Sequence, residues 1–190
     1  MRKFARKRGM ITTQLNSYEV ELLTSLVKQL VELVSDGEPE QYDTQQAGDP
    51  FERLVRDLKV DPDEPEVSED PVVRRLFPNA YPHDAAASSD FRRFTERDLR
   101  SKKVADAQVV LAALTRTEQG THDLRIEPAE GEAWLRTLTS VRLAVATRLG
   151  ITDAESAEDL AELPEEDPRS FMVSVYDWLG FAQETLIAAL

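Results

Sequence analysis

Residues 124–150 constrain the fold more than any other stretch, because they predict one long helix that must bury one face. Pro128 suits the first turn of a helix, where its missing N–H costs no hydrogen bond. Gly150 suits the left-handed position that follows the last turn. Between them, apolar residues recur at steps of four, three and four, the spacing of one face of an α-helix. These apolar residues are Trp134, Leu138, Val141 and Val145.

Arg142 lies within this apolar face. One interpretation is a side chain whose stem packs in the core and whose guanidinium bonds a carboxylate or helix-end carbonyls. The alternative is a clamp for an anion or another ligand, which no other feature of the sequence supports. We therefore expect Arg142 to be a structural buried charge.

A weak internal repeat relates the N-terminal part of the chain to this stretch. Residues 13–34 can be laid on residues 124–145, and both read as a short extended run, an acidic first turn and a long helix. The repeat predicts that the two extended runs, residues 10–15 and 122–126, pair as a small two-stranded ribbon. Such a ribbon is stable only with helices packed on it.

Capping signals mark the other helices. Asn16 and Glu19 are spaced as a capping pair for a helix that ends near Val34. Aspartate followed by proline, a helix-start signal, opens three predicted helices, at positions 49, 70 and 167. Short helices are predicted over residues 49–58, 70–77 and 154–163, the last capped by Thr152. A third long helix is predicted over about 90–114, with a break near Thr95, and the last helix begins at residue 167.

The composition favours helices over a β-rich fold. The chain of 190 residues has only 7 glycines and is rich in Ala, Leu, Glu, Arg and Val. It has no cysteine, which excludes disulfides, thiolate metal sites and thiol catalysis. We predict a mainly α, single-domain helical bundle of three long and several short helices, with one small two-stranded ribbon.

Residues 10–190 are predicted to form this domain, with acidic loops at 36–70 and 151–168, and residues 1–9 to form a basic flexible arm. No apolar segment of a signal peptide follows the basic N-terminus, and no run is long enough to span a bilayer. We therefore expect a cytoplasmic protein without a membrane partner.

Charge is unevenly distributed along the chain. Residues 36–70 carry thirteen acidic and three basic side chains, and residues 153–167 carry eight acidic and no basic ones. Because the whole chain carries −13, the remaining residues carry +5. The helical body is thus mildly basic and its connectors are acidic, an arrangement that commonly serves solubility.

Two basic clusters are candidate binding sites for a protein or for nucleic acid. One occupies the N-terminal arm, and the other occupies the helix predicted over residues 90–114. Charge runs are most often solvated surface, and the alternative is contact with an acidic partner or with phosphates. The candidate residues are Arg2, Lys3, Arg6, Lys7, Arg8, Arg92, Arg93, Arg97, Arg100, Lys102 and Lys103.

No catalytic motif is recognisable. The sequence contains no phosphate loop, dinucleotide-binding glycine motif, zinc-protease motif or nucleophile elbow. His83 and His122 stand apart in polar turns, and paired carboxylates lie in linkers or in first turns, where the helix dipole explains them. We predict no catalytic residue, no cofactor and no metal site, and hence a protein that is not an enzyme.

Three stretches carry a family resemblance: residues 70–81 (DPVVRRLFPNAY), 90–96 (DFRRFTE) and 134–150 (WLRTLTSVRLAVATRLG). With the opening helix, they resemble nearly the whole of an actinobacterial domain family that was long labelled as being of unknown function and later described as oxidative-stress regulators. This chain has Leu138-Thr139-Ser140 where the family usually has Leu-Asn-Asp before the arginine matched to Arg142.

The resemblance implies an intracellular transcriptional regulator that works with the RNA polymerase–sigma machinery under oxidative stress. The redox switch described for such regulators needs cysteines, so direct thiol sensing does not carry over to this chain. The first hypothesis is a regulator that binds a protein, RNA polymerase or a sigma factor. The alternatives are a DNA-binding protein that uses both basic clusters and an enzyme of unrecognised class, and a homodimer is compatible with all three.

Overall fold

The computed structural model describes residues 1–35, 68–164 and 166–190. The short helix predicted over 49–58 and most of the acidic loop predicted at 36–70 lie outside the described residues. Within them, the fold is mainly α. In chain order the elements are β1 (Ala5–Lys7), β2 (Met10–Thr13), α1 (Ser17–Ser35), α3 (Pro71–Leu76), α4 (Ala85–Thr115), β3 (Leu124–Ile126), the 3₁₀ turn η2 (Pro128–Glu130), α5 (Gly131–Leu149), α6 (Ala154–Ala161) and α7 (Ser170–Ile187).

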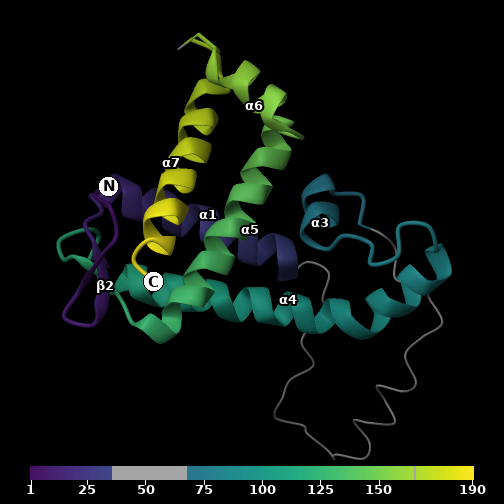
Figure 1. The fold of residues 1–190 in the computed structure, drawn as a ribbon, viewed down its shortest axis with the longest axis horizontal. Coiled ribbons are helices and arrows are strands. Elements are labelled where there is room, and N and C mark those ends of the chain that lie inside the picture. Colours follow the sequence, from purple (N-terminus) through teal and green to yellow (C-terminus); the bar gives the residue numbers. More distant parts are fainter. Residues whose placement is uncertain (36–67, 165) are drawn as a thin grey trace, which may run out of the picture.

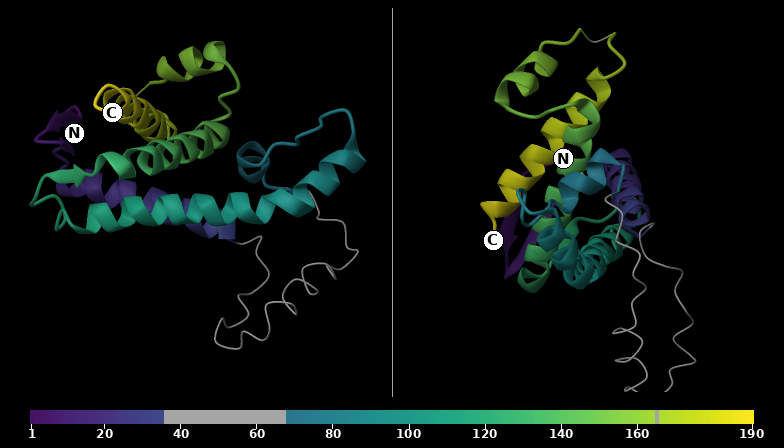
Figure 2. Two further views of the ribbon diagram at one scale, coloured as in Figure 1. Left: turned by 60° about the horizontal axis from the view of Figure 1, so that its bottom comes forward. Right: turned by 90° about the vertical axis from the view of Figure 1, so that its right-hand side faces the viewer.

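The long helix α4 is the element on which the bundle is assembled. It packs against α1 and α5, while α5 also packs against α3 and α7 (Figure 1). The apolar face predicted for residues 128–150 is confirmed, because its four apolar residues are all buried in α5. Figure 2 shows that the first turns of α4 extend beyond α1 and α5.

Local signals fixed several helix ends as predicted. The Asn16 side chain accepts from the Glu19 N–H, and the Glu19 side chain accepts from the Asn16 N–H, each at 2.9 Å. Asp70 caps α3 by accepting from the Val72 N–H at 2.7 Å. Gly150 ends α5 with φ of 79°, a left-handed conformation that a residue without a side chain adopts freely.

The helix predicted from residue 90, with a break near Thr95, differs from α4 in its start and in its continuity. α4 begins earlier, at Ala85, where Asp84 caps it, and it is continuous as far as Thr115. The Thr95 hydroxyl does not cap a new helix but donates to the Phe91 carbonyl at 2.7 Å, a bond that a threonine makes inside a helix. In α6 the cap is also displaced by one residue, because Asp153 and not Thr152 accepts from the Ser156 N–H.

The predicted pairing of the two extended runs is confirmed, and the sheet has a third strand. β2 and β3 pair antiparallel, with Ile11 opposite Ile126, and β1 pairs with the other edge of β2. Residues 5–7, which we expected to belong to a flexible arm, therefore form a strand. The Arg8-Gly9 turn makes this hairpin possible, because both residues adopt positive φ, at 51° and 83°.

Phe4 packs this N-terminal segment against the helices. Its side chain is buried, and its ring meets the edge of Trp134 on α5 with 6.4 Å between ring centroids. The sequence contained one signal of this packing, a single aromatic residue among five cations. Burial of its large ring stabilises a short edge strand.

Arg142 is half-buried between α5 and α7, but its partners differ from those expected. Its guanidinium lies 4.4 Å from the centre of the Tyr176 ring, and Nη1 donates to Gln183 Oε1 at 3.3 Å. Gly180 leaves room for it, since a Cβ there would lie 3.1 Å from Arg142 Nη2. An aromatic ring and a side-chain amide thus take the place of the expected carboxylate or helix-end carbonyls.

The last helix buries only part of its apolar side chains. Val175, Leu179, Ala182 and Leu186 are buried, but Phe171 is 52% exposed in the first turn of α7. The homodimer suggested by this apolar chain end stays a prediction. No helix among the described residues is long and apolar enough to cross a bilayer.

Candidate functional site

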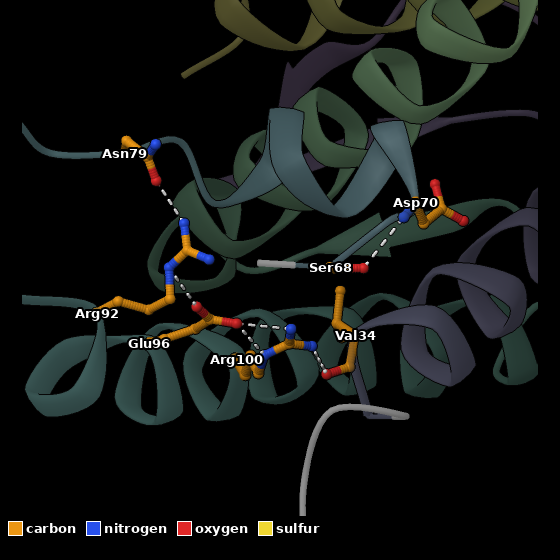
Figure 3. A network of polar contacts seen from close by, with 7 residues as sticks. All are labelled: Val34, Ser68, Asp70, Asn79, Arg92, Glu96 and Arg100. Carbon is orange, nitrogen blue, oxygen red and sulfur yellow. Dashed lines mark hydrogen bonds and ion pairs between the residues drawn. The ribbon is translucent and has the colours of Figure 1, made fainter. Parts of the chain in front are cut away.

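The basic run of α4 divides into cations that face the protein and cations that face solvent. Arg100, predicted as part of a binding surface, is instead 6% exposed and bonds inside the bundle (Figure 3). Nη1 donates to the Val34 carbonyl at the end of α1 at 2.7 Å, and Nε and Nη2 donate to Glu96 Oε1 at 2.9 and 2.7 Å. The guanidinium also lies 4.7 Å from the centre of the Phe77 ring.

Arg92 belongs to the same internal network. It donates to Asn79 Oδ1, and its Nε lies 3.3 Å from the second carboxylate oxygen of Glu96, which Arg100 also holds (Figure 3). Glu96 is four residues from each of the two arginines, so the pairing on one helix face was visible in the sequence. These two arginines therefore stabilise contacts within the fold.

Lys103 also turns inward. Its Nζ donates to the Ser140 hydroxyl on α5 at 3.1 Å and lies 5.7 Å from the centre of the Phe77 ring. Burial lowers the pKa of Lys103, and the charge of Asp106 opposes this shift. Asp106 itself holds Arg136 of α5 in a two-pronged ion pair, with bonds of 2.7 and 3.0 Å.

Replacing Lys103 by methionine is expected to leave the free energy of unfolding unchanged or to raise it. The burial that lowers the pKa of the lysine also disfavours its charged form in the folded chain, and methionine fills a similar volume without this cost. Urea denaturation of the two proteins measures the difference. A loss of more than about 1 kcal/mol would show that the bond to Ser140 outweighs the cost of burying the charge.

The other three cations of the run lie at the surface, together with apolar side chains. Arg93, Arg97 and Lys102 are exposed. Phe94 is 75% exposed, Phe91 is 43% exposed and Leu99 is 46% exposed. We call these six residues the basic–aromatic surface.

Residues 91–94 of the basic–aromatic surface lie on the first turns of α4, which extend beyond α1 and α5 (Figure 2), whereas Leu99 and Lys102 lie near the turn where Arg100 contacts the end of α1. The Arg93 guanidinium lies 5.9 Å from the centre of the Phe94 ring, and Tyr81 meets the edge of Phe91 at 6.0 Å. Aromatic residues and arginine are enriched in protein interfaces. The surface can therefore receive a partner that combines apolar side chains with carboxylates.

The N-terminal cations lie elsewhere. The sheet packs near the C-terminal end of α4, whereas the basic–aromatic surface lies near its N-terminal end (Figure 1). Phe94 and Ala113 are separated by about 28 Å along the helix axis. Arg2, Lys3, Lys7 and Arg8 are exposed, and Arg6 donates to the Leu190 carbonyl at 3.1 Å. The structure thus does not join the two basic clusters into one surface.

Clusters of metal-binding side chains are absent from the part of the chain that the structure describes. No group of three or more His, Cys, Asp or Glu residues there could hold a metal ion. His122 is exposed, with Nε2 3.4 Å from a carboxylate oxygen of Glu118. Open cavities of about 540 and 430 Å³ flank the turn at residues 121–123.

Comparison with known proteins assigns the chain to a family. The family model described as "Domain of unknown function (DUF2017)" matches residues 1–190. The chain belongs to this family. Its match over the whole length, and the mycobacterial relatives below, confirm the resemblance found in the sequence.

The relatives carry names that refer to regulation. This DUF2017 chain is 28% identical over 183 residues to the "Putative oxidative stress regulator AosR" of Mycobacterium leprae (strain TN), covering 91% of this chain and 79% of that protein. It is 28% identical over 131 residues to the "Oxidative stress regulator AosR" of Mycobacterium tuberculosis (strain ATCC 25618 / H37Rv), covering 64% of this chain and 58% of that protein. No solved structure matches the chain.

Proposed function

We propose that this DUF2017 protein is a non-enzymatic regulator of the oxidative-stress response, and that it acts by binding a protein of the RNA polymerase–sigma machinery. The names of its relatives support the regulatory role. The family resemblance supports the choice of machinery, and a partner of this kind would place the protein in the cytoplasm. The basic–aromatic surface of α4 is the contact that we assign to the partner.

The exposure of Phe94 is the observation that carries this proposal. A phenylalanine that leaves three-quarters of its surface in water gains little from folding, so it contributes little to the stability of the chain. Two further apolar side chains, Phe91 and Leu99, are exposed within two turns of the same helix. Phe91, three residues before Phe94, is its neighbour on the helix surface, and adjoining exposed apolar side chains commonly mark a site of interaction.

The charges around the cluster indicate the chemistry of the partner. Arg93, Arg97 and Lys102 are exposed, while Glu96 faces the internal arginines and does not offset them. Asp90 and Asp98 lie on the same stretch and reduce the positive charge without cancelling it. A partner segment with acidic and apolar side chains, such as an amphipathic acidic helix, matches this surface.

Replacing Phe94 by alanine is expected to weaken binding to purified RNA polymerase holoenzyme by at least about tenfold, which corresponds to about 1.4 kcal/mol. Replacing Arg93 by glutamate is expected to weaken it further and to remove most of its dependence on salt. Biolayer interferometry with the full chain immobilised measures both effects. The same titrations with core polymerase and with free sigma factor identify the subunit that is bound.

Two matched variants control for general effects. Phe171→Ala removes an exposed phenylalanine from α7, and Lys28→Glu reverses an exposed charge on α1, so both should bind the polymerase like the original chain. Unchanged binding by Phe94→Ala together with a loss for Phe171→Ala would move the contact to α7. If the chain bound neither the polymerase nor the sigma factor, the proposed function would be wrong.

A further inference from the structure

A second surface, at the opposite end of α4, is built from the outer face of the sheet. Leu124 and Ile126 of β3 point into the core, so Arg125 between them points outward. Arg125 lies opposite Thr12 of β2, and Thr12 lies opposite Ala5 of β1. Because side chains alternate along a strand, Lys7 is on the same outer face as Ala5.

This outer face borders the larger of the two cavities. The cavity of about 540 Å³ is lined by Ala113, Arg116, Thr121, His122, Asp123 and Arg125, so two arginines, one hydroxyl and one imidazole converge on it. The cavity also contains one carboxylate, that of Asp123, whose Oδ1 accepts from Gln14 Nε2 at 2.8 Å. The neighbouring Glu130 accepts from the Glu127 N–H at 3.0 Å and lies 3.6 Å from Arg116.

Three cations of this region have no carboxylate partner within residues 1–35, 68–164 and 166–190. Lys7 and Arg8 lie at the tip of the β1–β2 hairpin, and Arg125 lies on β3 at the other side of the sheet. All three are exposed. Neighbouring strands are about 4.8 Å apart, so these charges are spread over a face about 10 Å wide and continue into the cavity through Arg116.

We propose that this face binds the phosphate backbone of duplex DNA. Phosphate contacts need only cations, hydroxyls and backbone N–H groups, and they require no apolar anchor. The outer face largely has this composition, because its strands present Lys7, Arg125, Thr12 and Ala5, with the half-buried Met10 opposite Lys7 and no aromatic ring. A protein partner would find no anchor here of the kind that Phe94 offers on the other surface.

The proposal goes beyond the proposed function and does not depend on it. The two surfaces lie at opposite ends of α4, so one chain could contact DNA through the sheet and a protein through the helix (Figure 1). The proposal differs from the hypothesis of a DNA-binding protein that uses both basic clusters. Only the N-terminal cluster contributes, and Arg116 and Arg125, which the sequence did not single out, join it.

Salt dependence of binding tests the proposal. The full chain is titrated into a fluorescein-labelled DNA duplex of mixed sequence, and anisotropy gives the affinity at a series of salt concentrations. We expect the logarithm of the affinity to fall linearly with the logarithm of salt concentration. Arg125→Gln and Lys7→Gln should each weaken binding and reduce the slope by about one, because each removes one phosphate contact.

Lys28→Gln, which removes an exposed charge from α1, is the matched control and should leave both affinity and slope unchanged. Arg125 and Lys7 are both exposed, so melting temperatures close to that of the original chain should accompany the loss of binding. Phe94→Ala should retain full DNA binding, which separates this surface from the one that binds protein.

Three results would overturn the proposal. The first is no binding to the duplex by the original chain at about 50 mM salt. The second is an equal loss of affinity in Lys28→Gln and Arg125→Gln. The third is binding of inorganic phosphate, measured by calorimetry and dependent on Arg125, without binding of the duplex, which would make the cavity a site for a free anion.

Discussion

Replacing Trp134 by alanine is expected to lower the free energy of unfolding by about 4 kcal/mol. The side chain is fully buried in α5, where it packs against Phe4 and lies within the main core. Alanine would leave a cavity that the surrounding helices cannot fill, so the loss exceeds the transfer free energy of the ring alone. Urea denaturation followed by circular dichroism measures this loss.

The effect of Trp134→Ala should also reach the sheet. Phe4 joins the N-terminal strand to α5, so the backbone amides of β1 should exchange with solvent faster in the variant. Phe171→Ala is the matched control, because that ring is exposed, and its effect should stay within about 0.5 kcal/mol. A loss below about 1 kcal/mol for Trp134→Ala would contradict the assigned core.

Replacing Arg100 by alanine is expected to lower the free energy of unfolding by about 3 kcal/mol. The substitution deprives the Val34 carbonyl of its donor and Glu96 of two hydrogen bonds, in a region where solvent replaces them only in part. It also removes the contact with the Phe77 ring. Arg100→Lys should recover only part of this loss, because an ammonium cannot reproduce the geometry of the guanidinium.

Thermal and urea unfolding test Arg100→Ala against Lys102→Ala, a neighbouring exposed cation whose removal should change stability by less than about 0.5 kcal/mol. Equal stability of the two variants would contradict the buried, structural role of Arg100. The comparison matters for function as well, because loss of a partner by Arg100→Ala would report a weakened fold and not a lost contact.

Local interactions explain what could be predicted of the fold. Helix caps at Asn16 and Asp70, the left-handed Gly150 and the apolar spacing of α5 depend on residues within a few positions of one another. The pairing of β2 with β3 was also accessible, because the internal repeat pointed to two equivalent extended runs. The break expected near Thr95 failed because a threonine hydroxyl has two alternatives, a cap and the carbonyl one turn back.

The candidate surfaces could be predicted from the sequence only in part. The sequence marked both basic clusters, but it could not separate Arg93 from Arg100, which lie on the same helix. Nor could it indicate that Arg125, a single cation between two apolar residues, would share an outer face with Lys7. Both distinctions require knowledge of which elements pack on which side.

The sequence by itself therefore determined the helices, most of their caps and the main buried face, because neighbours along the chain fix hydrogen bonds and periodicity. Only the tertiary structure decided which cations are internal and which are exposed. Arg100 reaches a carbonyl 66 positions away and Lys103 a hydroxyl 37 positions away, and no local pattern records those partners. The exposure of a side chain is set by what packs over it, and that depends on the whole chain.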